Sequence, residues 1–408
     1  MKKNITIIGV NYFPETSAIG LYNTQLAEYL AQTNNVEVIT GFPYYPEWKI
    51  SNEYESKSMY FTESIKGITI YRYKQYVPSR PGFKNRVIHL FDFTVGSVGN
   101  LFKIKKSDLI ICIVPFTTSM VLGLFLSMLR GGKVWVHIQD FEFDAALDFD
   151  VTGNSNCIKS KIFKGLFWVE RLLLNKADIV STISEGMLSN LERKTSTMSY
   201  FLPNWVDPDF LDPKKAVKHE VMPSDKFKVL YSGNIGEKQD WSFFVEIVKH
   251  FRNYENIIFI VVGAGSKKEW LVKQLGELNN IEFFTPVAYE ELPNLLCSAD
   301  LHVLFQKKDA IDTVMPSKLL GMMASQVVSL VTGNKKSEVA KIFKKSRGGY
   351  FFDSECFYDV VAVIEDLSSH QEIAVELGVN ARNYVINHFS ATSVLDDFGK
   401  KVKNVIGS

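Results

Sequence analysis

Short apolar runs alternate with helix-like stretches along almost the whole chain, and this rhythm constrains the fold more than any other feature of the sequence. Strands that are apolar throughout and separated by helices pair in parallel, with helices covering both faces of the sheet. We therefore expect an α/β protein built on parallel sheets. The predicted strands are Asn4–Val10, Val36–Thr40, Gly67–Tyr73, Leu109–Val114, Val134–Ile138, Ile179–Thr182, Lys228–Ser232, Ile257–Val262, Ile281–Phe284, Leu301–Phe305, Val327–Val331 and Gly349–Phe352.

One break in this rhythm divides the chain. Leu202–Pro208 contains two prolines, and the polar stretch Asp212–Lys226 follows it. A chain of 408 residues is long enough for two or three domains. We expect two Rossmann-like domains that face a cleft, residues 1–205 and residues 206–384. The last stretch, about Val375–Val405, is helical with no strand after it, so its end, about residues 385–408, is expected to return to the first domain.

The overall composition excludes several classes of protein. Lys plus Arg is 46 and Asp plus Glu is 45, a net charge of +1, so nothing indicates a nucleic-acid partner. The four cysteines form no CxxC pair and the seven histidines are scattered. These patterns predict neither a metal site nor a disulfide framework. We also expect no bound cofactor and a cytoplasmic location.

Two segments could be mistaken for membrane signals. The apolar run Ile5–Val10 after Lys2 and Lys3 is short for a signal peptide, so it is interpreted as a strand. Leu109–Leu129 carries no charge and is long enough to cross a bilayer. Pro115 and the polar residues after it divide this segment, which favours a buried strand followed by a helix.

A glycine-containing loop follows the first strand of the second half. Gly233, Asn234 and Gly236 stand there before Lys238 and Gln239, where a helix is expected to begin. Backbone N–H groups, the helix N-terminus and the lysine could together bind a diphosphate. The alternative is a tight turn between strand and helix, and Gly263, after the next strand, allows the same two interpretations.

A second loop of this kind follows the strand Leu301–Phe305. Its polar residues run from Gln306 to Met315, and Pro316 takes a favoured first position in a helix that includes Ser317 and Lys318. The carboxyl end of a strand beside the amino end of a helix is where open α/β sheets bind nucleotides. An ordinary connection between strand and helix is the alternative.

In the first half, His137 and Asp140 lie at the carboxyl end of a predicted strand, and Gly20 opens the helix after the first strand. Each could reach a ligand. A lone histidine in an apolar strand is more often structural, and both interpretations stay open.

Two stretches combine basic and aromatic residues, Lys84–Lys106 and Lys159–Lys176. The first contains Phe91, Phe93 and Phe102. Amphipathic helices with a basic polar face can lie in a membrane interface. They can equally be core helices whose lysines are solvated.

Taken together, the motifs resemble the retaining glycosyltransferases of family 4, which have the GT-B fold, and especially the branch of colanic-acid-type enzymes and N-acetyl-L-fucosaminyltransferases of O-antigen and capsule assembly. The resemblance covers nearly the whole chain. Its motifs are, in order, Asn11–Glu15 with Gly20, Phe42–Pro46, His137–Asp140, Ser181–Ser184, Pro203–Trp205, Ser232–Gln239 and Pro316–Lys318.

This resemblance implies a metal-independent enzyme that transfers a sugar, with N-acetyl-L-fucosamine or a related sugar the best guess, from a UDP-sugar to an undecaprenyl-diphosphate-linked saccharide at the anionic inner face of the cytoplasmic membrane. His137 would approach the transferred sugar, with Asp140 and Lys238 also in catalytic positions. The implied donor-binding residues are Gly20, Gly233, Asn234, Gly236, Gln239, Gly263, Asp312, Thr313, Met315, Pro316, Ser317 and Lys318.

The chain departs from the family pattern at two places. Relatives carry a ribose-binding glutamate where this chain has Gly321, with Thr313 eight residues before it, and Asp309 or Asp312 are the possible substitutes. Asp240 and Trp241 stand where relatives often have a glycine. Two other functions remain possible, a nucleotide-sugar 2-epimerase and a non-catalytic nucleotide-sugar-binding protein.

Overall fold

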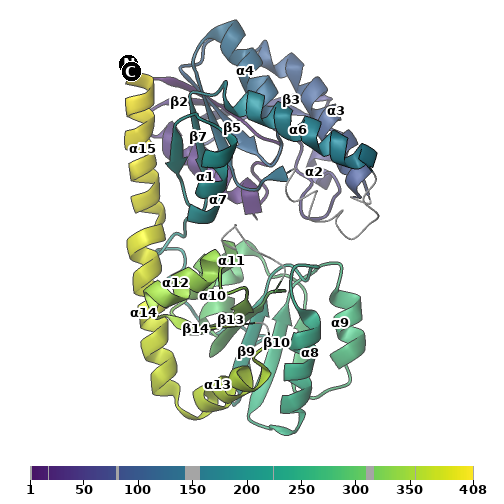
Figure 1. Ribbon diagram of the computed structural model, residues 1–408, viewed down its shortest axis with the longest axis vertical. Helices are drawn as coiled ribbons and strands as arrows, with labels where there is room; N and C mark the ends of the chain where they lie inside the picture. The colour runs from purple at the N-terminus through teal and green to yellow at the C-terminus, as the bar shows by residue number, and fades with distance from the viewer. Residues whose placement is uncertain are drawn as a thin grey trace. The chain divides into compact units, whose positions relative to one another are not determined.

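The computed structural model describes residues 2–16, 18–79, 82–142, 157–223, 225–308, 317–353 and 355–407. Each of its two compact units is a largely parallel sheet covered by helices (Figure 1). The first unit comprises residues 1–203 and 395–408, and the second comprises residues 204–394. Sequence patterns alone placed these boundaries near 205/206 and 384/385.

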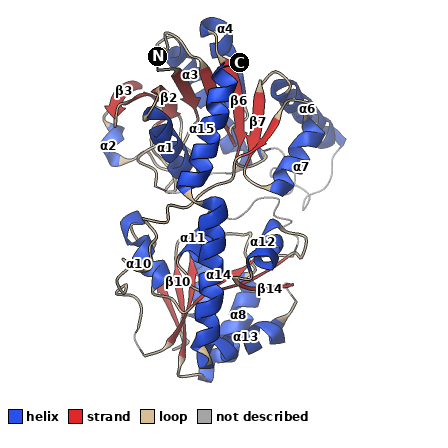
Figure 2. Ribbon diagram, turned by 90° about the vertical axis from the view of Figure 1, so that its left-hand side faces the viewer, coloured by secondary structure: helices blue, strands red, loops and turns tan. Residues whose placement is uncertain are grey.

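The sheet of the first unit has the order β3-β4-β2-β1-β5-β6-β7-β8. All its neighbours pair in parallel except β3 and β4. The strands are β1 Asn4–Ile8, β2 Asn35–Gly41, β3 Tyr60–Ile65, β4 Ile68–Tyr73, β5 Leu109–Val114, β6 Lys133–Ile138, β7 Ile179–Thr182 and β8 Ser199–Phe201. The helices are α1 Ala18–Ala31, α2 Asn52–Glu55, α3 Phe83–Leu101, α4 Thr118–Arg130, α6 Cys157–Leu174 and α7 Glu185–Lys194 (Figure 2).

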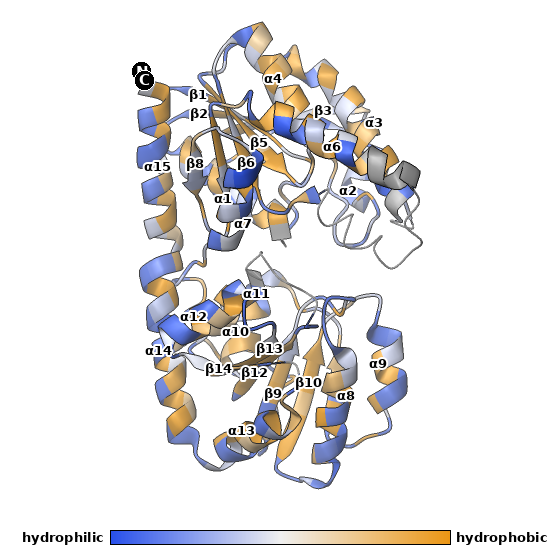
Figure 3. Cartoon of the chain, in the orientation of Figure 1, coloured by the Kyte–Doolittle hydropathy of each residue, from blue (hydrophilic) through white to orange (hydrophobic). Residues whose placement is uncertain are grey.

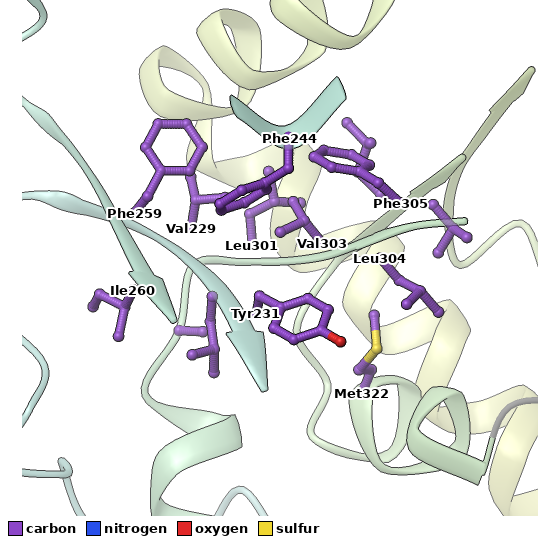
Figure 4. Packing of buried hydrophobic residues seen from close by; sticks show 14 of the residues in the cluster. Val229, Tyr231, Phe244, Phe259, Ile260, Leu301, Val303, Leu304, Phe305 and Met322 are labelled. Atoms are coloured by element: carbon purple, nitrogen blue, oxygen red, sulfur yellow. The ribbon is translucent and has the colours of Figure 1, made fainter. Parts of the chain in front are cut away.

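The sheet of the second unit has the order β11-β10-β9-β12-β13-β14 and is parallel throughout. Its strands are β9 Phe227–Ser232, β10 Ile257–Val262, β11 Ile281–Phe284, β12 Leu301–Phe305, β13 Ser329–Gly333 and β14 Gly349–Asp353. Its helices are α8 Trp241–His250, α9 Lys268–Leu275, α10 Leu292–Cys297, α11 Ser317–Ala324, α12 Glu338–Ser346, α13 Phe357–Ser369 and α14 Gln371–Phe389, with 3₁₀ turns at Phe251–Asn253 and Tyr289–Glu291. Phe244 of α8 packs on Phe259 and Phe305 in the core (Figure 4).

Two of these strands were not predicted. In β3 half-buried and exposed residues alternate, and a turn with positive φ at Lys66 (50°) and Gly67 (78°) joins β3 antiparallel to β4. Such a turn suits a two-residue hairpin. β8 has only three residues, all half-buried. Neither strand has the continuous apolar run that marks a buried parallel strand.

The C-terminal region contains two helices where one was predicted. Ser390 separates α14 from α15, which spans Ala391–Gly407, and it bridges to Val206. α14 stays with the second unit because the guanidinium of Arg382 donates to the carbonyls of Leu211 and Pro208, at 2.7 and 3.2 Å. The end of α15 belongs to the first unit, where the ring centroid of Phe398 lies 4.9 Å from that of Trp135.

The segment Leu109–Leu129 forms a buried strand and a helix, as expected. All six residues of β5 are buried, and α4 begins at Thr118. Among the described residues, no helix is both long enough and apolar enough to cross a membrane.

Candidate functional site

Two glycine loops pack against each other at the carboxyl ends of β9 and β10. The N–H of Gly233 donates to the carbonyl of Val262 at 2.9 Å, and the N–H of Ile235 donates to that of Ala264 at 2.8 Å. A Cβ added to Gly263 would lie 2.0 Å from the Gly233 carbonyl oxygen. Gly263 is therefore required for this packing, and direct contact with a ligand stays a prediction for it.

The surface of this loop offers groups for an anion. Within the described part of the chain, the backbone N–H groups of Asn234 and Gly236 donate to no other residue. Lys238 is exposed and forms no ion pair with a described residue. The acid next to it, Glu237, is paired with Lys267 at 3.0 Å. Two amides and one ammonium group thus remain for a ligand.

Lys318 brings a second cation to the same loop. Its Nζ would lie 3.1 Å from a Cβ at Gly233, so the glycine leaves room for the ammonium group. The Nζ also donates to the Tyr231 hydroxyl at 2.9 Å, and that hydroxyl donates to the Asn234 carbonyl at 2.6 Å. Burial lowers the pKa of Lys318 to about 8. Tyr231 therefore connects the start of α11 to the glycine loop.

The helix after this loop begins later than predicted. α8 starts at Trp241, and the carboxylate of Asp240 accepts a hydrogen bond from the Phe243 N–H at 3.1 Å. The Trp241 indole donates to the Gly236 carbonyl at 2.7 Å. Asp240 is thus the N-cap of α8 and Trp241 fixes the loop, which explains the departure from glycine at this place. The helix end is occupied by its own carboxylate, so we no longer expect it to bind phosphate.

Backbone pairing joins the two predicted nucleotide loops. Gln239 forms an antiparallel bridge with Gln306, and the Asp240 N–H donates to the Phe305 carbonyl at 2.9 Å. The side-chain oxygen of Gln239 is buried without a hydrogen-bond partner among the described residues. This oxygen is an available acceptor at the junction of the loops.

Part of the second loop lies outside the described residues. This applies to the predicted donor-binding residues Asp312, Thr313, Met315 and Pro316, and to Asp309. Ser317 is the first residue of α11. A Cβ at Gly321 would lie 3.3 Å from Cδ1 of Leu296, so a glutamate there would start against an apolar side chain. The ribose contact of the family pattern has no carboxylate at this position.

In the first unit, His137 is the second-last residue of β6 and is only 2% exposed. Its Nδ1 lies 2.9 Å from the Ser181 Oγ, which also accepts a hydrogen bond from the Trp135 indole at 2.7 Å. Burial lowers the pKa of His137 to about 3, so the imidazole is neutral at physiological pH. These contacts fit the structural interpretation, and contact with the transferred sugar stays a prediction.

The carboxylates after β6 differ in their surroundings. Asp140 is half-buried. Glu142 accepts hydrogen bonds from both the N–H and the hydroxyl of Thr117, each 2.8 Å long, directly before α4. Burial raises the pKa of Glu142. A double-displacement mechanism would need a carboxylate nucleophile near the anomeric carbon, and Asp140, Glu142 and Asp144 are the local candidates from the sequence. Glu142 is already bound to Thr117, which disfavours it in that role, and Asp144 lies outside the described residues.

Gly20 lies in the first turn of α1, against a buried acid that the sequence alone did not single out. A Cβ at Gly20 would lie 2.8 Å from the Cβ of Glu15 and 3.0 Å from its Oε2. Glu15 belongs to the motif Asn11–Glu15, but nothing in the sequence marks it as buried. In the described ranges, no group of three or more His, Cys, Asp or Glu residues is placed to bind a metal ion.

The two parallel-sheet units define an α/β protein with the GT-B fold, and comparison with known proteins identifies it as a glycosyltransferase. The family model "Glycosyl transferases group 1" matches residues 213–384. A putative colanic acid biosynthesis glycosyl transferase, WcaI of Escherichia coli (strain K12), is 35% identical over 356 residues, which cover 83% of this chain and 85% of that protein. The chain belongs to the group 1 glycosyl transferases, so the resemblance seen in its motifs is confirmed.

Solved structures agree on the fold. Sucrose-phosphate synthase from Thermosynechococcus elongatus superposes with a TM-score of 0.75 at 15% identity, covering all of both chains. HepE of Anabaena, in a complex with UDP and glucose, gives 0.70 at 11% identity over 98% of this chain and all of that one. WaaG, a glycosyltransferase involved in lipopolysaccharide biosynthesis, gives 0.66 at 13% over 99% and 100%.

Proposed function

We propose that this glycosyltransferase moves a sugar from a UDP-sugar to a lipid-linked saccharide during the assembly of a surface polysaccharide such as O-antigen or capsule. The observation that carries the proposal is the meeting of Lys318 with the Gly233–Lys238 loop at the carboxyl end of β9. Two lysines and unused amides there suit a diphosphate. The similarity to WcaI favours a polysaccharide precursor as acceptor, and N-acetyl-L-fucosamine or a related deoxy or N-acetyl sugar is the best guess for the donor.

The proposed chemistry follows from charge. When the sugar leaves, negative charge builds on the diphosphate oxygens, and Lys238, Lys318 and the amides of the loop offset it. No metal ion is required in this scheme. Transfer would retain the configuration at the anomeric carbon, with a departing phosphate oxygen helping to take the acceptor proton on the same face. The engagement of Glu142 with Thr117 favours this route over a carboxylate nucleophile.

A product assay tests the proposal. The enzyme is incubated with a series of UDP-sugars and undecaprenyl-diphosphate-linked GlcNAc, and lipid products are detected by mass spectrometry. We expect the acceptor to gain one sugar and UDP to be released in equal amount. An altered nucleotide sugar formed without acceptor would instead indicate an epimerase. Tight UDP binding with no turnover on any acceptor would indicate a non-catalytic binding protein.

The proposed site of action is the inner face of the cytoplasmic membrane. Three neighbouring helices of the first unit, α3, α4 and α6, expose large apolar side chains; Figure 3 shows apolar residues along α3 and α4. Phe91 is 68% exposed, Met128 84% and Trp168 63%. Exposed basic residues accompany them, among them Lys84 in α3 and Lys164 and Arg171 in α6, and such residues attract anionic lipid. We infer peripheral attachment through this surface.

The lysines Lys103, Lys105 and Lys106 of the first basic stretch are a natural choice for testing this attachment, but the described contacts favour other residues. Phe93 is buried against Phe116 and does not contribute to the surface. Lys103 lies over the rings of Tyr60 and Tyr71, and Lys106 pairs with Asp108 at 3.3 Å, so changing them would disturb the fold locally. Phe91→Glu combined with Met128→Glu is a cleaner variant. It should no longer float with anionic liposomes but should bind UDP normally, and unchanged flotation would refute the attachment.

A further inference from the structure

Tyr231 has a hydroxyl group that lies between the two nucleotide loops, and no motif assigns it a role. The residue belongs to β9, is only 2% exposed, and has its ring in the apolar core of the second unit (Figure 4). A buried hydroxyl needs hydrogen-bond partners. Both of its partners are parts of the candidate site, namely the carbonyl of Asn234 and the ammonium group of Lys318.

The two hydrogen bonds of this hydroxyl have a fixed direction. Its O–H donates to the Asn234 carbonyl at 2.6 Å, because a carbonyl can only accept. The hydroxyl proton is then used, so the oxygen is left to accept from Nζ of Lys318, which is 2.9 Å away. Burial raises the pKa of Tyr231, so the hydroxyl keeps its proton at physiological pH. Tyr231 therefore presents an acceptor to the charged form of Lys318.

Lys318 has few other partners. Among the described residues, no carboxylate forms an ion pair with it. Its Nζ also lies 4.5 Å from the centroid of the Tyr231 ring, a cation–π contact. On the other side is Gly233, whose φ of 131° and missing Cβ leave room for the ammonium group. One tyrosine thus supplies both the acceptor and the ring that hold this lysine against the glycine loop.

The glycine loop is held by bonds that do not involve the tyrosine. The N–H of Ile235 donates to the Ala264 carbonyl at 2.8 Å, and the Ile235 carbonyl accepts from the Lys267 N–H at 3.0 Å. The peptide groups on both sides of this residue are therefore fixed. Removal of the Tyr231 hydroxyl should leave the loop in place and should release mainly the ammonium group of Lys318.

Trp241 supports the tyrosine from a second direction. The ring centroids of Tyr231 and Trp241 lie 4.8 Å apart, and the rings meet edge to face at 73°. The same indole donates to the Gly236 carbonyl at 2.7 Å, so it is itself anchored to the loop. Trp241 stands where relatives often have a glycine. This support of Tyr231 therefore belongs to the present chain and not to the family pattern.

We propose that Tyr231 is a positioning residue for the donor, because its hydroxyl holds the Lys318 ammonium group over Gly233, where the diphosphate of the nucleotide sugar would lie. Tyr231 acts through the lysine and does not itself touch the diphosphate. This inference rests on the proposed function and adds the residue that fixes the second cation of the site.

Removing a single oxygen atom tests the proposal. Tyr231→Phe keeps the ring, and with it the contacts to Trp241 and Lys318. UDP affinity by calorimetry should fall about five- to tenfold, the effect of one hydrogen bond. Tyr254→Phe is the matched control, because its hydroxyl bonds to Glu365 at 2.5 Å and precedes β10, at the opposite edge of the same sheet. This control should bind UDP within about twofold of the wild type.

A double-mutant cycle separates positioning from a general effect on the fold. If Tyr231 acts through Lys318, Tyr231→Phe should lower UDP affinity by less than about twofold in a protein that already carries Lys318→Met. An equal loss in both backgrounds overturns the proposal. Unchanged UDP affinity in Tyr231→Phe alone overturns it as well.

A titration without nucleotide completes the test. An acceptor stabilises the ammonium form, so loss of the Tyr231 hydroxyl should lower the pKa of Lys318 below its value of about 8. The charged residues of the glycine loop, Glu237 and Lys238, are the same in all variants. NMR of protein with isotope-labelled lysine, with the Lys318 signal assigned from Lys318→Met, should show this lower pKa in Tyr231→Phe and the wild-type pKa in Tyr254→Phe.

The NMR result also separates this inference from the proposed function. A Lys318 pKa that is equal or higher in Tyr231→Phe overturns the positioning role. If the wild type binds no UDP while the pKa of Lys318 falls in Tyr231→Phe, the proposed function fails, and Tyr231 stands as the residue that holds this ammonium group.

Discussion

Lys318→Met should stabilise the second unit while it weakens nucleotide binding. Burial lowers the pKa of Lys318 from 10.5 to about 8. Each pKa unit corresponds to about 1.4 kcal/mol, so keeping this lysine charged lowers the free energy of unfolding at neutral pH by about 3 kcal/mol. Loss of the hydrogen bond to the Tyr231 hydroxyl, and of the cation–π contact with its ring 4.5 Å from Nζ, takes back about 2 kcal/mol. The net expected gain is about 1 kcal/mol, which for a unit of this size raises Tm by roughly 3 °C.

The stability difference between Lys318→Met and the wild type should depend on pH in a definite direction. The folded protein releases the Lys318 proton near pH 8, whereas the unfolded chain keeps it up to about pH 10.5. The free energy of unfolding of the wild type therefore rises with pH across that window relative to the variant. The advantage of Lys318→Met should be full below pH 8 and should disappear by about pH 10.5.

Urea denaturation of both proteins at pH 7 and pH 10 measures the difference. Calorimetry with UDP on the same samples should show a loss of about 1.5–3 kcal/mol in the variant, the usual contribution of a charged hydrogen bond. Lys238→Met is the matched control, because removing that exposed lysine should lower UDP affinity with no gain in stability. A Lys318→Met variant that is less stable than the wild type, or that binds UDP normally, would refute the reasoning.

Three further predictions concern the site. UDP affinity of the wild type should fall as pH rises through about 8, where Lys318 loses its charge, and Lys318→Arg should remove this dependence in calorimetric titrations from pH 7 to 9.5. His137→Ala should lower turnover much more than it lowers UDP affinity, whereas equal losses together with a lower Tm would mark a purely structural histidine. Because the pKa of His137 is about 3, the activity of the wild type should show no titration of this group between pH 5 and 8. Activity should survive EDTA, and a loss that Mn²⁺ or Mg²⁺ restores would refute metal independence.

The sequence by itself determined the architecture of this protein. Apolar runs such as Leu109–Val114 and Ile257–Val262 coincide with the strands β5 and β10, since a strand buried on both faces needs a continuous apolar sequence. The position of Gly233 at the end of β9 was predictable for a similar reason, because loops at the carboxyl ends of parallel strands must turn sharply into the next helix. Family membership followed from the order of such motifs.

Tertiary structure decided which polar groups meet. Lys318 and Tyr231 are 87 residues apart, and only the adjacent placement of β9 and β12 in the sheet brings the ammonium group to the glycine loop. The same holds for Glu15, whose carboxylate binds the backbone of Tyr44 and Tyr45. Local sequence patterns indicate which residues of one segment are buried and where that segment turns. They do not predict contacts between distant segments, because such contacts depend on strand order and on the path of each loop.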